Sequence, residues 1–338
     1  MTQFVWNCFN HNKTGIMSLE DIIEIISGQL VALGHKAAWG ISGATGDQKN
    51  AHMVMKASGI NFIVEGFREY HIREISEKYQ QGARFILLAT EEPTEKGFNH
   101  GTQKEMIERQ EIFPKVAPFI EGIIHLVPGE HVTRWYSQFA PSAYTELGWS
   151  PTIMRNKTLD PFTRKSIDAP IIVKNKDGTQ RIIPEPDFDF GFFGSLTPRR
   201  QKLLRWIEKQ TGKPVRLVCD FASRTERDSS MRRAKVILQI RKFDEMGLVS
   251  SSRCNTSLAI GRPVVAEPHD LCKPWDEVVR FSKTPESFLT EAMAVRAMWK
   301  GVYQTQLAKF KATFPPEVCI GRALEQIGFG TEAQRKAS

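Results

Sequence analysis

The segment from Asp187 to Val218, DFDFGFFGSLTPRRQKLLRWIEKQTGKPVRLV, constrains the fold more than any other part of the chain. Its residues predict a short apolar strand, a turn at Gly194, a helix that begins at Pro198 and a second strand. Two strands with a helix between them are the unit from which parallel sheets are built. The segment therefore predicts an α/β architecture.

Apolar strands alternate with helices on both sides of this segment. Before Pro151 we expect strands in QFVWNCF, AAWGI, NFIVEGF, RFILLATE and GIIHLV, with helices between them. After Pro186 we expect strands in FGFFG, VRLVCDF, KVILQI and RPVVAEP, and then a long helical tail from about Thr284. This alternation predicts two parallel sheets, each with helices on both faces.

A proline-rich stretch separates the two sets of strands, and its KNKDG turn predicts a small hairpin. A chain of 338 residues is long enough for two domains. We therefore expect a Rossmann-like N-terminal domain at residues 1–150, a linker at 151–186 and a Rossmann-like C-terminal domain at 187–315. A C-terminal helix and tail complete the chain at 316–338.

Composition limits the class of protein. The five cysteines are scattered without a C-x-x-C pair, which argues against a disulfide framework or a zinc site and favours a reducing compartment. No apolar run is long enough to span a membrane, and the N-terminus lacks a secretory pattern, so we expect a cytoplasmic protein. A formal net charge of +8 favours a polyanionic partner.

The turn between the first strand and helix of the C-terminal domain has the chemistry of an anion site. Gly194 permits a sharp turn, Thr197 can cap the helix, and Pro198 suits its first position. Unpaired N–H groups at a helix N-terminus attract anions. The guanidinium groups of Arg199 and Arg200 can each form bidentate hydrogen bonds with a phosphate.

Further along, SSSRCNTSLAIGRPVVAEP places Arg253 early in a helix and Glu267 at the end of a strand. In an open parallel sheet, ligands bind beyond the carboxyl ends of the strands. Arg253 is therefore expected to face the same site as Gly194, and Glu267 can accept hydrogen bonds from ribose hydroxyls. Together these residues favour a nucleotide site.

These segments, with ERDSSMRRAKVILQI between them, resemble the C-terminal half of bacterial glycosyltransferases with the GT-B fold. The resemblance covers about a quarter of the chain, and it implies two Rossmann-like domains that face a cleft. It matches ten residues here: Gly194, Ser195, Arg199, Arg200, Glu226, Arg227, Asp228, Lys235, Arg253 and Glu267. One departure is that Gln239, Ile240 and Arg241 stand where relatives carry Asn-Ile-His, so the donor can differ.

The resemblance implies transfer of a sugar from a nucleotide-activated donor to a hydroxyl of a glycan, a lipid-linked molecule or another acceptor. It assigns donor binding to the C-terminal domain, through Gly194, Ser195, Arg199, Arg200, Lys235, Arg253 and Glu267. It implies no metal and no cofactor beyond the donor. We interpret Asp187 and Asp189, an Asp-x-Asp pair, as solvent-facing residues that precede the strand, and not as metal ligands.

An inverting enzyme of this class needs a general base for the acceptor hydroxyl. Carboxylates at strand ends of the first domain are the candidates, with Glu91 first, Glu65 second and Glu92 beside them. His11, in the loop after the first strand, is a further candidate. A retaining enzyme requires no such base.

Other functions share parts of this pattern. A nucleic-acid or anion-binding protein without catalysis would explain the positive charge, although no recognition motif is present and no nucleic acid is expected. A two-lobed binding protein would share the hinge, and a sugar-nucleotide epimerase can share the fold. Contact with the inner face of a membrane is compatible with the basic charge, and the oligomeric state is open.

Overall fold

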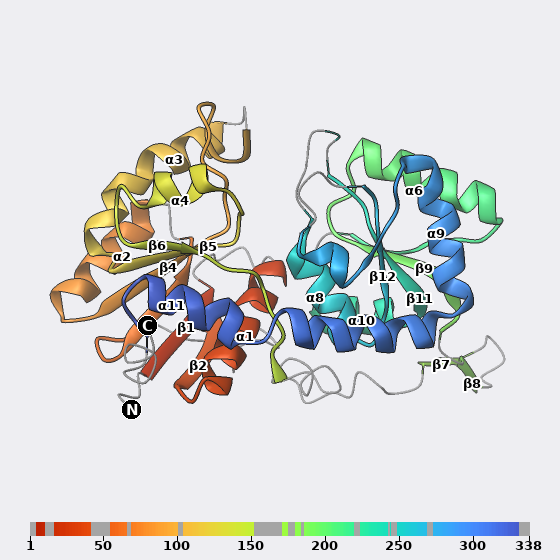
Figure 1. The fold of residues 1–338 in the computed structure, drawn as a ribbon, viewed down its shortest axis with the longest axis horizontal. Coiled ribbons are helices and arrows are strands. Elements are labelled where there is room, and N and C mark those ends of the chain that lie inside the picture. Colours follow the sequence, from red (N-terminus) through yellow and green to blue (C-terminus); the bar gives the residue numbers. More distant parts are fainter. Residues whose placement is uncertain are drawn as a thin grey trace. The chain divides into compact units, whose positions relative to one another are not determined.

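The computed structural model describes residues 5–10, 17–41, 55–65, 69–100, 104–151, 171–174, 180–183, 186–219, 224–242, 244, 249–268 and 273–330. The chain divides into two compact units, one formed by Met1–Thr152 with Phe314–Ser338 and the other by Ile153–Thr313. The N-terminal unit therefore includes the C-terminal tail. Figure 1 shows the elements of both units.

The N-terminal unit contains a parallel sheet in the order β2-β1-β3-β4-β5-β6. Its strands are β1 (Val5–Asn10), β2 (Lys36–Ile41), β3 (Ile60–Val64), β4 (Arg84–Ala89), β5 (Gly122–His125) and β6 (Ser142–Tyr144). Its helices are α1 (Met17–Ala32), α2 (Glu69–Gln80), α3 (Lys104–Val116), α4 (Glu130–Tyr136) and α11 (Arg322–Gln326). Helices α2, α3 and α4 cover one face of the sheet, and α1 and α11 cover the other (Figure 1).

The C-terminal unit has a second parallel sheet, in the order β10-β9-β11-β12-β13. Its strands are β9 (Phe188–Phe193), β10 (Arg216–Val218), β11 (Ala234–Gln239), β12 (Val264–Ala266) and β13 (Arg280–Phe281). Its helices are α6 (Pro198–Thr211), α7 (Arg224–Arg232), α8 (Ser251–Ala259), α9 (Pro285–Ala297) and α10 (Trp299–Thr313). An antiparallel pair, β7 (Ile171–Lys174) and β8 (Gln180–Ile183), forms the hairpin expected around KNKDG.

Alternation along the strands explains why helices cover both faces of this second sheet. Phe190, Phe192, Val236 and Leu238 pack with residues of α6 and α9 in one buried cluster. Ile237 belongs to a separate cluster with residues at the end of α7 and α8, on the opposite face. Because both faces are buried, the strands are nearly continuous apolar runs.

Both sheets reverse their strand order next to their first strand, between β1 and β3 and between β9 and β11. Ligands of open α/β sheets bind beyond the carboxyl ends of the strands at such a reversal. The loops that follow β9 and β11 lie at this reversal in the C-terminal unit, and the loop that follows β3 lies at it in the N-terminal unit, beside the loop that follows β4. Within the described residues, no helix is long and apolar enough to cross a membrane.

Candidate functional site

The loop after β9 brings the backbone against an arginine of α8. Gly194 has a φ of 127°, in the region that side chains disfavour. A Cβ atom added at Gly194 would lie 2.7 Å from Nη2 of Arg253. The backbone conformation therefore favours glycine here, and a side chain at this position would displace the Arg253 guanidinium.

Arg253 is held at the first turn of α8, behind the N-cap Ser250, whose hydroxyl accepts from the Arg253 N–H. Its Nε donates to the Phe193 carbonyl at 2.9 Å, and its Nη1 donates to the side-chain oxygen of Gln239. The guanidinium lies over the ring of Phe192, 5.3 Å from its centroid. No carboxylate among the described residues contacts it.

Arg200 lies beside Arg253 and is also buried, with 4 % of its surface exposed. Its Nη1 donates to the Ser195 carbonyl and its Nη2 to the Ile240 carbonyl, both at 2.9 Å. Its guanidinium contacts the same ring of Phe192, 5.2 Å from the centroid. Within the described part of the chain, its hydrogen-bond partners are neutral oxygens.

Two neighbouring cations without a contacting carboxylate leave a local excess of positive charge. Burial, together with the charge of Arg200, lowers the pKa of Arg253 to about 9. Burial also lowers the pKa of Arg200 from its ordinary value, although the negative charge of Glu267, which Arg199 neutralises, opposes the shift. An anion bound at this place would compensate both charges, because an opposite charge favours the ionised form of a buried group.

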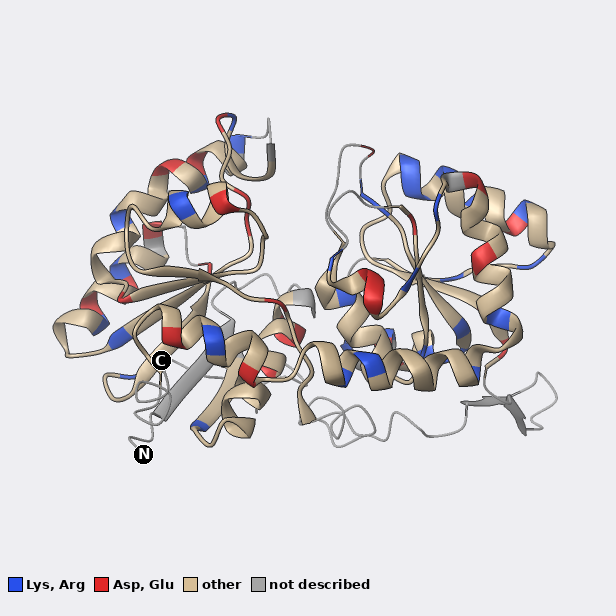
Figure 2. Cartoon of the chain, in the orientation of Figure 1, with Lys and Arg blue, Asp and Glu red and all other residues tan. Residues whose placement is uncertain are grey.

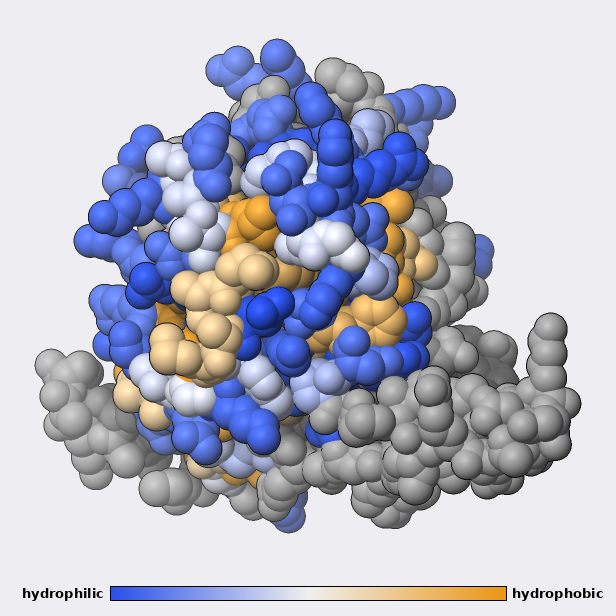
Figure 3. Space-filling model, turned by 90° about the vertical axis from the view of Figure 1, so that its right-hand side faces the viewer, coloured by the Kyte–Doolittle hydropathy of each residue, from blue (hydrophilic) through white to orange (hydrophobic). Residues whose placement is uncertain are grey.

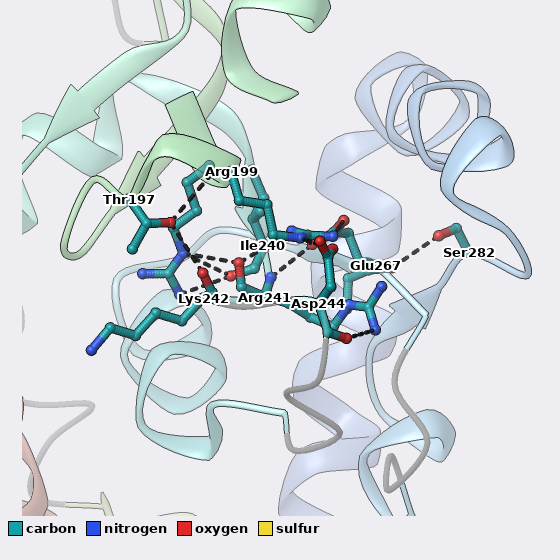
Figure 4. A network of polar contacts seen from close by, with 10 residues as sticks. Thr197, Arg199, Ile240, Arg241, Lys242, Asp244, Glu267 and Ser282 are labelled. Carbon is teal, nitrogen blue, oxygen red and sulfur yellow. Dashed lines mark hydrogen bonds and ion pairs between the residues drawn. The ribbon is translucent and has the colours of Figure 1, made fainter. Parts of the chain in front are cut away.

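Arg199 is arranged differently from Arg200. Its Nη1 and Nη2 donate to the two carboxylate oxygens of Glu267 at 3.0 and 2.8 Å, and its Nε donates to Asp244 (Figure 4). Glu267 is 1 % exposed and also accepts from the backbone N–H of Arg241 at 2.7 Å. Glu267, which was predicted to accept hydrogen bonds from a ribose, is therefore already paired with Arg199. A ribose hydroxyl would have to share the carboxylate oxygens of Glu267 with this arginine.

The structure does not bring Lys235 together with the other predicted donor residues. Lys235 lies at the amino end of β11, and its Nζ contacts Asp189 at 2.9 Å. The expectation that Asp189 precedes the strand and faces solvent is wrong, because it lies within β9 and is 4 % exposed. Its carboxylate pairs with three cations, and Asp187 pairs with Arg233.

Two further residues of the resemblance lie within α7. Arg227 and Asp228 are both about 2 % exposed and form an ion pair at 2.7 Å, with the Arg227 guanidinium over Phe193. They pack beneath the strand end that carries Gly194. The side chain of Glu226 lies outside the described residues.

In the N-terminal unit, the structure brings two predicted carboxylates together on one arginine. Nη2 of Arg109, on α3, lies 2.5 Å from Oε2 of Glu65, and its Nη1 lies 2.6 Å from Oε1 of Glu91. Glu65 follows β3 and Glu91 follows β4, with 6 % and 7 % of their surfaces exposed. Glu65 has a φ of 60°, which is rare for a residue with a side chain and is typical of strained functional positions.

Neighbouring polar groups fix these carboxylates. Thr90 donates to Oε1 of Glu65, and Nδ2 of Asn99 donates to Oε2 of Glu91. The Tyr136 hydroxyl donates to the backbone carbonyl of Glu91 at 2.9 Å. The two glutamates are therefore held by groups from three separate elements.

Glu91 has a strongly shifted pKa. Burial, and then the negative charge of Glu65, raise its pKa from an ordinary 4.5 to about 7, although Arg109 and Asn99 oppose the shift. A carboxylate with a pKa near neutrality can accept and release a proton under physiological conditions. The carboxylate of Glu92 lies 3.1 Å from Nε2 of His131. His11, the remaining candidate, lies outside the described residues.

Sequence reasoning missed Arg109, Asn99 and Tyr136. An arginine within a helix and a tyrosine at a helix end carry no pattern that connects them with distant strand ends. Asn99 offers a weak signal, because it adopts a left-handed conformation in the irregular loop after Glu91, and asparagine tolerates that conformation. Across the ranges that the structure describes, no group of three or more His, Cys, Asp or Glu residues could hold a metal ion.

No family model and no curated protein sequence matches the chain. Solved structures do match its fold. An alpha-glucosyltransferase in complex with UDP and a 13-mer DNA containing an HMU base has a TM-score of 0.60 at 9 % identity, covering 97 % of this chain and 100 % of that chain. A glycosyltransferase from Rickettsia africae ESF-5 has a TM-score of 0.50 at 9 % identity, covering 97 % and 98 %.

A third match is the N-terminal domain of Candida albicans trehalose-6-phosphate phosphatase, with a TM-score of 0.51 at 8 % identity over 98 % of both chains. Identities this low carry the fold alone. The chain thus has the α/β fold of two Rossmann-like domains found in GT-B glycosyltransferases, with a C-terminal helix, as expected from its sequence.

Proposed function

We propose that this protein is a glycosyltransferase that moves a sugar from a nucleotide-activated donor to an acceptor hydroxyl. One observation carries the proposal: Arg200 and Arg253 are buried side by side at the carboxyl edge of the C-terminal sheet, and no described carboxylate contacts either. Gly194 leaves the space beside them free of a side chain. A nucleoside diphosphate supplies the missing negative charge and suits two guanidinium groups.

The same groups would assist the reaction by stabilising the leaving diphosphate. The bond between the sugar and the diphosphate breaks while the acceptor oxygen bonds to the sugar carbon, so negative charge grows on the leaving oxygen. Arg253 and the N-terminus of α8 are oriented before the reaction begins, which is the arrangement that lowers such a barrier. This chemistry needs no metal, and we propose that the enzyme works without one.

The N-terminal unit would bind the acceptor. In an inverting reaction, Glu91 would take the proton of the acceptor hydroxyl, and Arg109 with Asn99 would hold its carboxylate in position. The acceptor would be a hydroxyl of a glycan or a lipid-linked molecule. We place the protein in the cytoplasm, in contact with the inner face of a membrane where the acceptor is lipid-linked.

Nucleic acid is a second candidate acceptor. Two matched alpha-glucosyltransferase structures contain DNA beside UDP, and this chain carries a formal net charge of +8. The two acceptor classes are distinguished by mass spectrometry of duplex DNA with hydroxymethylated bases and of glycan mixtures after incubation with donor. The acceptor is the class of molecule whose mass increases by one hexose.

The experiment that tests the proposal is thermal unfolding in the presence of UDP, GDP, dTDP, CDP and CMP in turn. A ligand at about a hundred times its dissociation constant stabilises a protein by roughly 2.7 kcal/mol. We expect one nucleotide to raise the unfolding midpoint of the wild type but not of Arg253→Ala. Arg205→Ala, which removes an exposed arginine of α6, is the matched control and should respond like the wild type. If no nucleotide raises the midpoint, the proposal is wrong.

A further inference from the structure

We propose that the amino edge of the C-terminal sheet binds the phosphate backbone of a nucleic acid. This edge is the end of the sheet opposite to Gly194 and Arg253, where the strands begin. The proposal does not depend on the glycosyltransferase assignment, and it departs from the expectation, drawn from the sequence, that no nucleic acid binds. It rests on the charge, arrangement and extent of the side chains at this edge.

Cations outnumber carboxylates where the strands begin. Figure 2 shows Lys and Arg segments around the lower ends of these strands and on α10. Seven cations contact residues at the starts of β9, β10, β11 and β12 or share an aromatic ring with such a cation: Lys213, Arg216, Arg233, Lys235, Arg262, Arg296 and Lys300. The carboxylates with such contacts in the described chain are Asp187, Asp189 and Glu208. We call this set the amino-edge surface.

Asp189 is the centre of this surface. Its carboxylate lies 2.7 Å from Nη1 of Arg296, 2.9 Å from Nζ of Lys235 and 3.2 Å from Nζ of Lys213. The side chains of these cations are 30 %, 32 % and 60 % exposed, so their charged ends reach solvent. One carboxylate cannot neutralise three cations, and the group retains positive charge that an external anion can use.

Aromatic rings hold the arginines of the surface in place. Arg216 and Arg233 both lie over Phe188, 5.6 and 5.1 Å from its centroid, and Nε of Arg216 donates to the Ser230 hydroxyl at 2.6 Å. Arginines that are stacked and hydrogen-bonded lose little conformational freedom when a phosphate binds them. This surface is therefore organised before any ligand arrives.

The surface extends to the start of α10. Arg262 lies over the Trp299 ring at 4.9 Å, and Lys300 lies over it at 5.6 Å. Nε of Arg262 donates to the Ala234 carbonyl at 2.7 Å, which ties this group to the start of β11. Basic groups thus run from β10 across β9 and β11 to Arg262, two residues before β12.

The extent of this row favours a polymer over a single phosphate. Adjacent strands lie about 4.8 Å apart, so four neighbouring strands extend roughly 14 Å. Duplex DNA carries a charge for about every 1.7 Å of its axis, so a row of this length can contact several phosphates at once. A lone phosphate would use only one of the groups.

The chemistry favours nucleic acid over a lipid surface. Three of the cations, Arg216, Arg233 and Arg262, are arginines fixed on aromatic rings, whereas membrane binding relies on mobile basic chains beside exposed apolar groups. Met298 is exposed next to Trp299, with 67 % of its surface accessible. Figure 3 shows that the face at the right of Figure 1 is mainly hydrophilic and surrounds a band of apolar side chains. Because apolar side chains beside basic ones can also bind a membrane, the test includes lipid vesicles.

The test measures binding of the full chain to a duplex DNA of about 20 base pairs at several salt concentrations. The triple variant Lys213→Gln, Arg296→Gln, Lys300→Gln removes three of the cations but leaves Lys235 on Asp189, so the buried carboxylate keeps a partner. We expect the Kd of the triple variant for DNA to rise roughly ten-fold or more. We also expect the slope of log K against log salt to decrease in magnitude by about two to three, because each lost phosphate contact removes about 0.9. Stabilisation by the nucleotide should not change, because the donor edge is intact.

The matched control removes three exposed charges from the N-terminal unit, by Lys78→Gln, Lys104→Gln and Lys115→Gln. It has the same net charge as the test variant and should bind DNA like the wild type. Equal binding by the two variants overturns the proposal, as does the absence of DNA binding by the wild type in low salt. Binding to phosphatidylserine vesicles without binding to DNA also overturns it.

Discussion

Two glutamates from separate strand ends share one arginine in the N-terminal unit. Arg109 contacts both Glu65 and Glu91, so two negative charges are balanced by one positive charge in a buried place. Such an arrangement favours protonation of one carboxylate, because two buried like charges repel each other. The pKa of Glu91 is accordingly raised to about 7, first by burial and then by Glu65.

This shift predicts how stability depends on pH. In the unfolded chain Glu91 releases its proton near its ordinary pKa of 4.5, whereas the folded protein keeps the proton until about pH 7. Between these values unfolding releases a proton, so the free energy of unfolding falls as the pH rises. The loss is complete above the folded pKa and is on the order of 3 kcal/mol.

Glu91→Gln should remove this loss, because an amide does not titrate. Denaturant unfolding of the wild type and the variant between pH 4 and pH 8, at about one-unit steps, gives the difference in free energy. We expect the variant to gain stability relative to the wild type as the pH rises, and Glu92→Gln to show no such gain. A constant difference between wild type and Glu91→Gln would contradict the assignment.

The sequence identified the carboxylates but not the group that joins them. Glu65 and Glu91 were candidates because they end apolar strands, and the structure places both at one sheet edge. Arg109 lies 44 residues after Glu65, within a helix, where nothing in the pattern connects the two. Lys235 shows the converse limit, because a motif match alone does not say which end of a strand a residue occupies, and Lys235 lies at the amino end of β11.

At the scale of elements, the connection from β9 to α6 follows the rules read from its sequence. Thr197 is the N-cap, its hydroxyl accepts from the N–H of Arg200 at 3.4 Å, and Pro198 is the first helical residue. Gly212 ends the helix in a left-handed conformation. The element therefore begins and ends where its capping residues predict.

Gly194→Ala should disable this connection as a binding loop. A new Cβ would meet Arg253 at 2.7 Å, and the backbone conformation would cost roughly 1–2 kcal/mol in addition. We expect the nucleotide that stabilises the wild type to bind at least about ten-fold more weakly, a difference near 1.4 kcal/mol, as measured by titration calorimetry. Gly212→Ala is the matched control, since Gly212 also has a positive φ but nothing within 4 Å. Equal loss in both variants would show that strain alone, and not the approach to Arg253, is responsible.

Elements with a clear apolar pattern were predictable, and elements without one were not. The nine expected strands and the helices between them are present in the described chain, and the hairpin is formed by β7 and β8. Strands β6 and β13 were missed because SAY and RF lie in no apolar run, whereas the equally short β10 and β12 lie within the apolar segments VRLVCDF and RPVVAEP.

At the scale of the whole molecule, the C-terminal segment belongs to the N-terminal unit. The chain passes between the units at residues 152–153 and again at 313–314. The Trp149 N–H donates to the Phe314 carbonyl at 2.8 Å, and Phe314, Ile320, Leu324 and Ile327 are buried. Composition places a boundary near this position, but it does not say to which sheet the last helices return.

Ile327 joins this tail to the N-terminal sheet. It is 4 % exposed, and its Cδ1 lies only 2.8 Å from where a Cβ on Gly122 of β5 would be, so the two pack closely. Ile327→Ala would leave a cavity and cost about 2–5 kcal/mol. Because the contact lies within the N-terminal unit, we expect the loss of stability to be confined to that unit.

Hydrogen exchange followed by mass spectrometry measures this selectivity. Amide exchange should accelerate in peptides from β4, β5 and α11 and stay unchanged in peptides from β9 and β11, since local opening follows local contacts. Val318→Ala is the control, because Val318 is 44 % exposed and its truncation leaves no cavity. Equal acceleration in both units would mean that the two unfold as one cooperative body, and the tail would then stabilise the whole chain and not the N-terminal unit alone.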